Sequence, residues 1–105
     1  PNITDAVIIS GDTIKVTFNK EIVQEMPNIN PSNYILQYST GFNVAKKVPI
    51  SIIYIDSKTM VLKFDSLDFE TSYKISALEL KDYSGNVTNL SSEQNSAVTV
   101  RMGKR

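Results

Sequence analysis

The chain has 105 residues, its 11 basic side chains balance 11 acidic ones, and it contains neither cysteine nor histidine. This length predicts a single domain that can bury a core without cross-links. Balanced charge argues against nucleic-acid or anionic-membrane binding, since both need clustered Lys and Arg. Without Cys or His the chain has no disulfide, no thiolate nucleophile, and neither the commonest general base nor the commonest transition-metal ligand.

No apolar run approaches the roughly 18 residues of a membrane-spanning helix. The first residues, Pro1–Thr4, lack the basic and then apolar pattern of a signal peptide. We therefore expect no membrane insertion and a chain that starts at a domain boundary. Residues 1–102 are predicted to form one domain, and residues 103–105 are interpreted as a linker or an appended tail.

Apolar and polar residues alternate with a period of two along most of the chain, which is the pattern of half-buried β-strands. A first strand is expected around Ala6–Ser10. Turn residues 11–12 separate it from a second strand in which Ile14, Val16 and Phe18 alternate with polar residues. Further alternating segments lie at 34–38, 60–64, 73–77 and 98–100.

Three segments depart from simple alternation. The run Ile50–Ile55 is apolar on both faces, so it predicts either a central strand or an edge strand that a loop covers. Glu21–Met26 predicts at most a short helical turn, which Pro27 ends, and residues 30–33 predict a turn into the next strand. Residues 86–96 are polar and predict a long loop.

After Ala77 the alternation slips, because Leu78 and Leu80 fall on the opposite parity. A β-bulge would produce this slip. In total the pattern predicts about seven strands joined by short turns. Because each strand has one polar face, antiparallel sheets packed face to face are favoured.

The segment Leu67–Ile75 contains a Leu, a turn and then Thr-x-Tyr-x-Ile at the start of a strand. This pattern resembles the tyrosine corner of fibronectin-III-like and immunoglobulin-like sandwiches. We expect the Tyr73 ring to pack beside the core and its hydroxyl to bond a backbone group in the range 67–70. The alternative is a tyrosine that contacts a ligand, which the Leu-to-Tyr spacing favours less.

Taken in order, several segments resemble the bacterial Ig-like modules of S-layer and other secreted surface proteins. Thr13–Lys20 resembles the opening strand of that family, and Asn30–Tyr34 resembles its P-x-N-Y lead-in to the third strand. Phe69 departs from the fibronectin-III-like pattern, which usually has Pro there. The remaining matching segments are Thr59–Phe64, Leu67–Ile75 and Asp82–Asn86.

The resemblance implies an all-β, Ig-like Greek-key β-sandwich of about seven antiparallel strands. It also implies an extracellular location, on a bacterial cell surface or secreted, and a spacer, self-assembly or adhesion role. The expected partners are neighbouring domains of the same chain, with a cell-surface or glycan contact as a further expectation. A fold alone does not fix a function, so these implications rest on analogy.

Asp82, Gly85 and Asn86 have the composition of a tight turn, because Asp caps its own backbone and Gly accepts positive φ. The alternative is a calcium site. Calcium takes six to eight oxygen ligands, so this loop would need further carboxylates brought by folding. The candidates are Asp5, Asp56 and Glu93. The turn is favoured, and no cofactor or metal residue is predicted, with calcium left as the open alternative.

Asp65, Asp68 and Glu70 form a small acidic cluster. Glycosidases hold two carboxylates across a cleft, whereas residues this close in one turn predict a solvated loop. Ser and Thr are plentiful, yet no His and no Ser-x-x-Lys pair is present to activate a nucleophile. The chain is therefore predicted to be no enzyme, with no catalytic residue. Lys46 and Lys47 predict a solvated loop tip.

Tyr38, Phe42 and Tyr54 are the candidates for an aromatic binding strip. Core packing explains Tyr38 and Tyr54 more simply, whereas Phe42 follows Gly41 in an expected loop and is the best candidate for contact. The favoured function is a non-catalytic structural module. The alternative is a carbohydrate-binding module, attached to a glycan-degrading enzyme, that uses Phe42 and the loop 39–47. Three glycosylation-like triplets, at 2–4, 86–88 and 89–91, are expected by chance.

Overall fold

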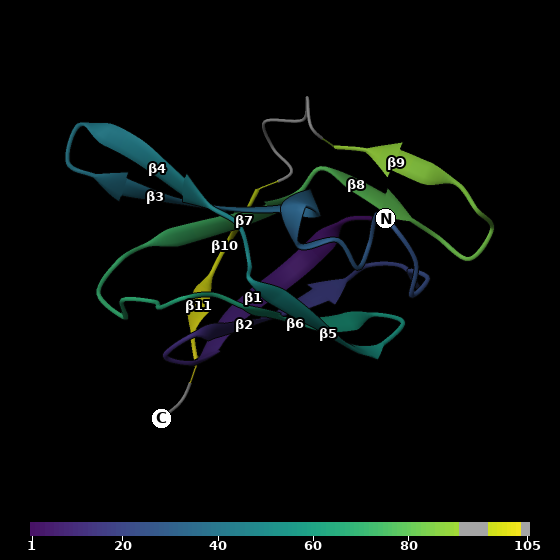
Figure 1. Cartoon of the computed structure of the whole chain (residues 1–105), viewed down its shortest axis with the longest axis horizontal. Coiled ribbons are helices and arrows are strands. Elements are labelled where there is room, and N and C mark those ends of the chain that lie inside the picture. Colours follow the sequence, from purple (N-terminus) through teal and green to yellow (C-terminus); the bar gives the residue numbers. More distant parts are fainter. Residues whose placement is uncertain (91–96, 104–105) are drawn as a thin grey trace.

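Two β-sheets face each other across one apolar core in the computed structural model, which describes residues 1–90 and 97–103 (Figure 1). The larger sheet contains, in spatial order, β11 (Arg101–Met102), β1 (Ile3–Ser10), β2 (Thr13–Phe18), β6 (Thr59–Lys63) and β5 (Ser51–Asp56). The smaller sheet contains β10 (Val98–Thr99), β7 (Tyr73–Ala77), β3 (Tyr34–Thr40) and β4 (Asn43–Lys47). A separate hairpin consists of β8 (Glu79–Lys81) and β9 (Val87–Asn89), and the 3-10 turn η1 (Pro31–Asn33) precedes β3.

The predicted all-β sandwich is confirmed. The chain crosses from one sheet to the other after β2, β4, β6 and β10, so sequential strand pairs alternate between the layers. All pairings are antiparallel except β1 with β11, which is parallel. The strands outnumber the seven expected, because β8, β9 and β11 are pieces of two or three residues that alternation does not reveal. The loop expected at 39–47, with Lys46 and Lys47 at its tip, is also wrong, because these residues form the end of β3, a tight turn and the strand β4.

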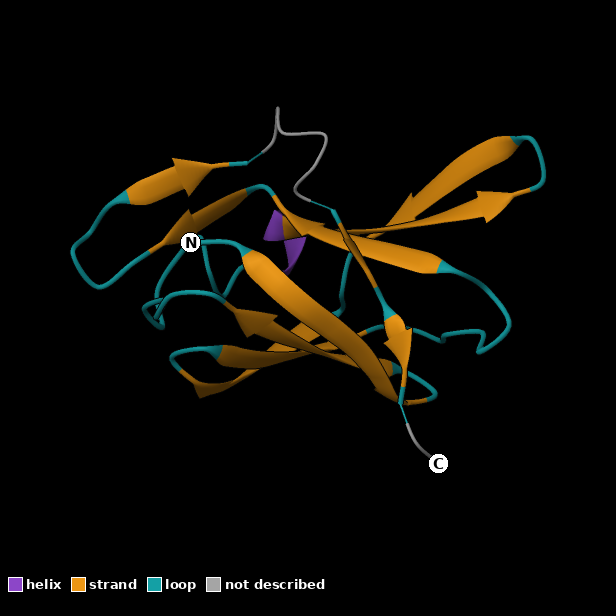
Figure 2. Cartoon of the chain, turned by 180° about the vertical axis from the view of Figure 1, so that it is seen from behind, coloured by secondary structure: helices purple, strands orange, loops and turns teal. Residues whose placement is uncertain are grey.

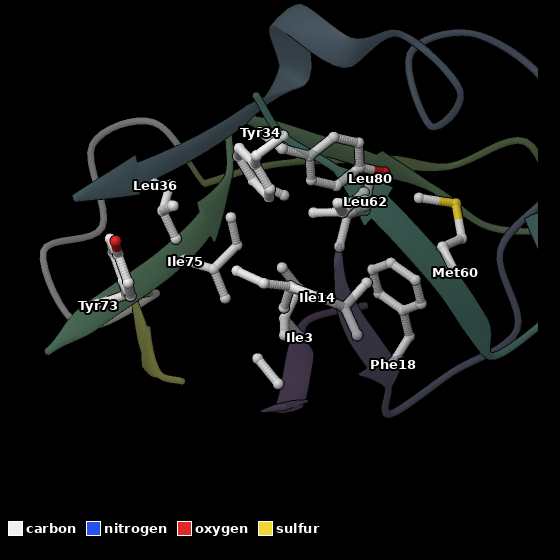
Figure 3. Packing of buried hydrophobic residues seen from close by; sticks show 14 of the residues in the cluster. Ile3, Ile14, Phe18, Tyr34, Leu36, Met60, Leu62, Tyr73, Ile75 and Leu80 are labelled. Carbon is white, nitrogen blue, oxygen red and sulfur yellow. The ribbon is translucent and has the colours of Figure 1, made fainter. Parts of the chain in front are cut away.

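The core forms where the period-two pattern places it. Alternate residues of β2 are buried, and the same holds for β6, β3 and β7 (Figure 3). Burying each such side chain contributes roughly 1.5–3 kcal/mol, so the core is the main source of stability. The central members are Ile14, Val16, Phe18, Tyr34, Leu36, Met60, Leu62, Phe64, Ile75 and Leu80.

The apolar run at 50–55 forms an edge strand. Among the described strands β5 pairs only with β6. Ile53 and Ile55 are 53% and 55% exposed, so the covering loop that the sequence suggested is wrong for their face of the sheet. A register irregularity between Tyr54 and Asp56 leaves Ile55 as the extra residue of the strand.

The slip after Ala77 is a change of sheet, so the predicted bulge is wrong. Leu78 leaves the smaller sheet, with its N–H donating to the Asn33 carbonyl at 2.8 Å, and the chain continues into β8. The Asn33 side chain then holds β8 at Glu79, accepting from its N–H at 2.9 Å and donating to its carbonyl at 2.7 Å. Because the next strand belongs to another sheet, the alternation of buried and exposed residues in β8 is independent of that in β7.

Residues 21–26 contain no helix. Ile22 forms an isolated bridge with Asp82, and the Val23 N–H donates to the Lys81 carbonyl at 3.2 Å. The segment therefore runs beside the β8–β9 hairpin, and the turn lies at 26–29. The loop predicted at 86–96 is wrong at residues 87–89, which form β9. Its residues 91–96 lie outside the described residues.

Buried Asn28 completes the attachment of the β8–β9 hairpin. Its Nδ2 donates to the carbonyls of Val23 and Lys81, both at 2.8 Å, and its Oδ1 accepts from the Lys81 N–H at 2.8 Å. Its own carbonyl accepts from the Tyr34 hydroxyl at 2.5 Å. With Asn33 at Glu79, two asparagine amides thus bond alternate residues of β8, as a neighbouring strand would.

The parallel pair β1–β11 fixes how the chain passes through the domain. Parallel strands run in the same direction, so the start of β1 and the end of β11 lie at opposite ends of the sandwich (Figure 2). Arg101 donates two hydrogen bonds to the Asp5 carboxylate, at 2.9 and 2.8 Å, and these lower the pKa of Asp5 and raise that of Arg101. The Gly103 N–H continues the pairing to the Ile8 carbonyl at 3.0 Å. In the described part of the chain, no helix is long and apolar enough to cross a membrane.

Alkaline pH is expected to destabilise the domain through Tyr34. Burial raises the pKa of Tyr34 well above its ordinary value of 10. The unfolded chain loses this proton near pH 10, whereas the folded chain keeps it, so stability is full below about pH 10 and falls as pH rises further. Burial also raises the pKa of Tyr54, to about 12, which acts in the same direction.

Urea unfolding of the wild-type chain and of Tyr34→Phe at pH values from about 8 to 12 measures this effect. Tyr34→Phe lowers stability at pH 8, because the hydroxyl bond to Asn28 is lost, but its stability should decline less above pH 10. Equal declines in both proteins would show that Tyr34 does not carry the effect.

Candidate interaction surface

The tyrosine corner is formed by the side chain that the sequence indicated. Tyr73 is buried, and its hydroxyl oxygen accepts from the Asp68 N–H at 2.9 Å, within the predicted range 67–70. The Tyr73 ring packs edge-on to Tyr38, with ring centroids 5.6 Å apart. Lys47 Nζ lies 5.5 Å from the Tyr38 ring centre and 3.1 Å from Asp65. These contacts attach the crossing between β6 and β7 to the smaller sheet, so the structural interpretation of Tyr73 is confirmed.

Tyr73→Phe should lower the free energy of unfolding by about 1–2 kcal/mol, because the Asp68 N–H loses its partner while the ring packing remains. Chemical denaturation measures the change directly. A matched control is Tyr83→Phe, since the Tyr83 side chain is largely exposed and should change stability little. A Tyr73→Phe variant as stable as the wild type would contradict the corner's contribution.

The Asp82–Asn86 segment is the turn of the β8–β9 hairpin. Asp82 Oδ1 accepts from the N–H groups of Ser84, at 2.9 Å, and Asn86, at 3.0 Å, and Gly85 has φ +86°. Gly85 is needed there because a Cβ disfavours positive φ. The turn interpretation is confirmed. Across the described ranges 1–90 and 97–103, no three acidic residues are grouped closely enough to hold a metal ion.

The acidic residues of the β6–β7 crossing serve different purposes. Asp65 pairs with Lys47, and that hydrogen bond lowers the pKa of the Asp65 carboxyl. Asp68 accepts from the Glu70 N–H at 2.8 Å and from the Thr71 hydroxyl at 3.1 Å, so it stabilises its own loop. Glu70 is exposed. The structure therefore does not set two of these carboxylates across a cleft.

The three aromatic candidates do not form one strip. Tyr38 belongs to the smaller sheet and packs on Tyr73, whereas Tyr54 belongs to the larger sheet and donates to the Ile22 carbonyl at 2.6 Å. Phe42 is different, because its side chain is fully exposed, as the sequence suggested. Gly41, with φ +81°, makes the tight β3–β4 turn that presents it.

A shallow hollow of about 460 Å³ lies on the smaller sheet near this hairpin. More of its lining surface is apolar than polar, and hydroxyl, amide and ammonium groups lie beside two tyrosines and one valine. Such groups donate and accept hydrogen bonds. The lining residues are Gln37, Tyr38, Ser39, Val44, Ser72, Tyr73, Lys74 and Thr99.

The two ends and the two outer edges differ in character. The β3–β4 and β8–β9 hairpins project from opposite ends of the molecule (Figure 1). The outer strand β4 carries Lys46 and Lys47, whereas the outer strand β5 carries exposed isoleucines and no lysine. The sequence contained a signal for this apolar edge, since 50–55 is apolar on both faces. The asparagines that begin the three glycosylation-like triplets are all exposed, namely Asn2, Asn86 and Asn89.

No family model and no curated protein matches the sequence. The fold is similar to that of the S-layer protein SbsC. A crystal structure of rSbsC superposes with TM-score 0.76 at 21% identity, covering 99% of this chain and 14% of that one. The N-terminal part of SbsC superposes with TM-score 0.70 at 20% identity, covering 96% of this chain and 22% of that one.

A thermostable esterase superposes less closely, with TM-score 0.56 at 12% identity over 92% of this chain and 34% of that one. At these identities the likeness establishes a shared fold. The chain thus has the fold of a segment found within the S-layer protein SbsC, and it spans only a small fraction of the length of that protein.

Proposed function

We propose that this chain is a non-catalytic structural module of a multidomain bacterial surface protein of the S-layer kind. The observation that carries the proposal is the superposition of nearly the whole chain on a small segment of SbsC. A fold that occupies 99% of this chain and 14% of a surface-layer protein suits a unit joined to others. Its partners would be the neighbouring domains, and its location would be extracellular.

The path of the chain supports a spacer role. Because β1 and β11 are parallel, the chain enters at one end of the sandwich and leaves at the other. Successive modules of this kind extend in one direction, so each sets a fixed distance between its neighbours. The stiffness comes from the shared core of both sheets and from the hydrogen bonds and ion pair that join β1 to β11.

The surface location is tested with an antibody raised against the folded 105-residue chain. Intact cells of the bacterium that encodes it should bind the antibody, and external protease should remove the signal while a cytoplasmic marker survives. Labelling only after the cells are lysed would overturn the proposed location. Purified chain tested against generic ester and glycoside substrates should show no turnover above a heat-denatured sample.

A second candidate is carbohydrate binding, which the fully exposed Phe42 ring favours. Aromatic rings stack on the apolar faces of sugars, and the hydroxyl and amide groups of the hollow beside the β3–β4 hairpin would supply hydrogen bonds. A glycan array tests this candidate directly. Binding that Phe42→Ala abolishes and Tyr83→Ala leaves intact would support it. If no glycan binds, the structural module is the remaining candidate function.

A further inference from the structure

We infer that the edge strand β5 binds β5 of a second copy of this chain, antiparallel and about a two-fold axis at Ile53. The pairing would join two five-stranded sheets into one continuous sheet. The inference deepens the proposed function and rests on it, because it names the partner through which one surface-layer module contacts a module in another molecule.

The outer edge of β5 is open and apolar. Among the described strands it pairs only with β6, so the other side of the strand presents unpaired N–H and C=O groups. Ile50, Ile53 and Ile55 are 61%, 53% and 55% exposed. Val61 lies opposite Ile53 on β6 and extends the same outward row. Exposed apolar side chains along an unpaired edge favour the addition of another strand.

The other edges of the two sheets carry the usual protection against such pairing. Outer strand β4 has Lys46 and Lys47, and two copies paired there would bring four lysines together. Outer strands β10 and β11 have only two residues each, and β11 bears Arg101. Charged side chains and short strands are the common ways in which proteins block edge pairing. Within β5 only the last residue, Asp56, is charged, so this edge is the least protected of the four.

The register follows from the geometry of antiparallel strands. Opposite residues in such a pair share one face of the sheet, so a two-fold axis must pass at a residue. An axis at Ile53 places this residue against its own copy, sets Ile52 opposite Tyr54, and sets Ser51 opposite Ile55. All of these residues are uncharged, and Ile53 is close to the middle of the strand.

The charges at the ends of the strand also suit a second copy. Antiparallel pairing brings the Asp56 end of each strand to the Ser51 end of the other, where Lys63 pairs with Ser51 across the sheet. The two Asp56 carboxylates are thereby kept apart, and each approaches a lysine. Lys63 is available for this contact, because its side chain is 47% exposed and its amine lies 4.0 Å from Asp12.

A ladder this short makes a small interface, so the affinity of one pair is expected to be weak. A weak contact repeated along a chain of linked modules strengthens by avidity. The isolated chain should therefore dimerise only at high concentration. Its apparent mass should rise from 11.7 kDa toward twice that value as its concentration increases.

Sedimentation of the 105-residue chain from about 10 µM to about 1 mM, the range in which weak interfaces saturate, tests the inference. Ile53→Lys sets two lysines together on the axis and should raise the dissociation constant about tenfold or more. Val44→Lys, at an exposed position of the β4 edge, is the matched control and should dimerise like the wild type. Circular dichroism confirms that both variants fold.

Cross-linking gives a second readout, because the natural chain has no cysteine. Ile53→Cys should form a disulfide-linked dimer on oxidation much faster than Val44→Cys, since only residues near the axis come within disulfide distance. A chain that stays monomeric at 1 mM, or a Val44→Lys variant as impaired as Ile53→Lys, would overturn the inference. Either result leaves the spacer role standing, because surface labelling of cells tests that role separately.

Discussion

Asn28→Ala should lower the free energy of unfolding by about 3 kcal/mol, one of the two largest effects expected from a single substitution here. Asn28 is fully buried, and its amide makes three hydrogen bonds to the backbone of Val23 and Lys81. Alanine removes the partner of the Val23 carbonyl and of the Lys81 N–H, whereas the Lys81 carbonyl keeps the hydrogen bond from the Val23 N–H. Each buried polar group left unpaired costs about 1–3 kcal/mol, reduced where water reaches it.

Urea denaturation measures the change, and Asn30→Ala is its matched control. Asn30 accepts a single hydrogen bond, from the Ser32 N–H at 3.1 Å, in an exposed position. Its loss should cost about 0.5–1 kcal/mol, as for other caps at the start of a helical turn. Hydrogen exchange of β8 and β9 should also rise in Asn28→Ala, because the hairpin loses part of its attachment to 23–28. Equal stability of the two variants would contradict the role of the Asn28 amide in attaching the β8–β9 hairpin.

Phe64→Ala should cost about 3–5 kcal/mol, the usual range for removing a phenylalanine ring from a packed core. Phe64 has no exposed surface and follows β6 into the space between the two sheets. Its N–H donates to the Asp12 carbonyl at 2.7 Å, so the backbone has little freedom to close the cavity. For a domain of this size such a loss removes a large part of the total stability.

The chain provides a control of the same residue type. Phe42 is fully exposed at the β3–β4 turn, so Phe42→Ala should change the unfolding free energy by less than about 0.5 kcal/mol. Denaturation curves measured for both variants separate the effect of burial on stability from the effect of the residue type. A Phe42→Ala variant as unstable as Phe64→Ala would mean that the hairpin tip is covered rather than free.

The sequence predicted the sandwich because each main strand buries one face. Ile14, Val16 and Phe18 alternate strictly with polar residues, and Met60, Leu62 and Phe64 alternate with Val61 and Lys63. The Tyr73 corner was also predictable, since Leu, turn and Tyr lie close together in one segment. The Asp82–Asn86 turn was readable for the same reason: its hydrogen bonds join residues two to four positions apart.

Features set by distant contacts could not be read in this way. Asn28 and Asn33 look like loop residues, and only folding brings them to Lys81 and Glu79, 53 and 46 positions away. The change of sheet at Leu78 imitates a bulge, because both shift the parity of buried residues. The β1–β11 pairing sets Val7 beside Arg101, which also bonds Asp5, 96 positions away, and β11 is a two-residue strand that carries no periodic signal.

The candidate surfaces were predictable to different degrees. Phe42 was recognised because a large ring directly after Gly41 has no place in an alternating strand. The open edge at β5 was only half visible, since an apolar run on both faces fits a central strand equally well. Its position in the sheet depends on which strands pair, and that order is decided by the whole fold.

As a spacer, the domain holds its neighbours at fixed distances along a line. Solution X-ray scattering of proteins with one, two and three copies of the chain joined end to end tests it most directly. If the modules extend in one direction, the maximum dimension should grow by a constant step for each copy, between the 30 and 41 Å extents of one domain. A maximum dimension that barely grows from two copies to three would show that the copies fold back on one another, and would contradict the spacer role.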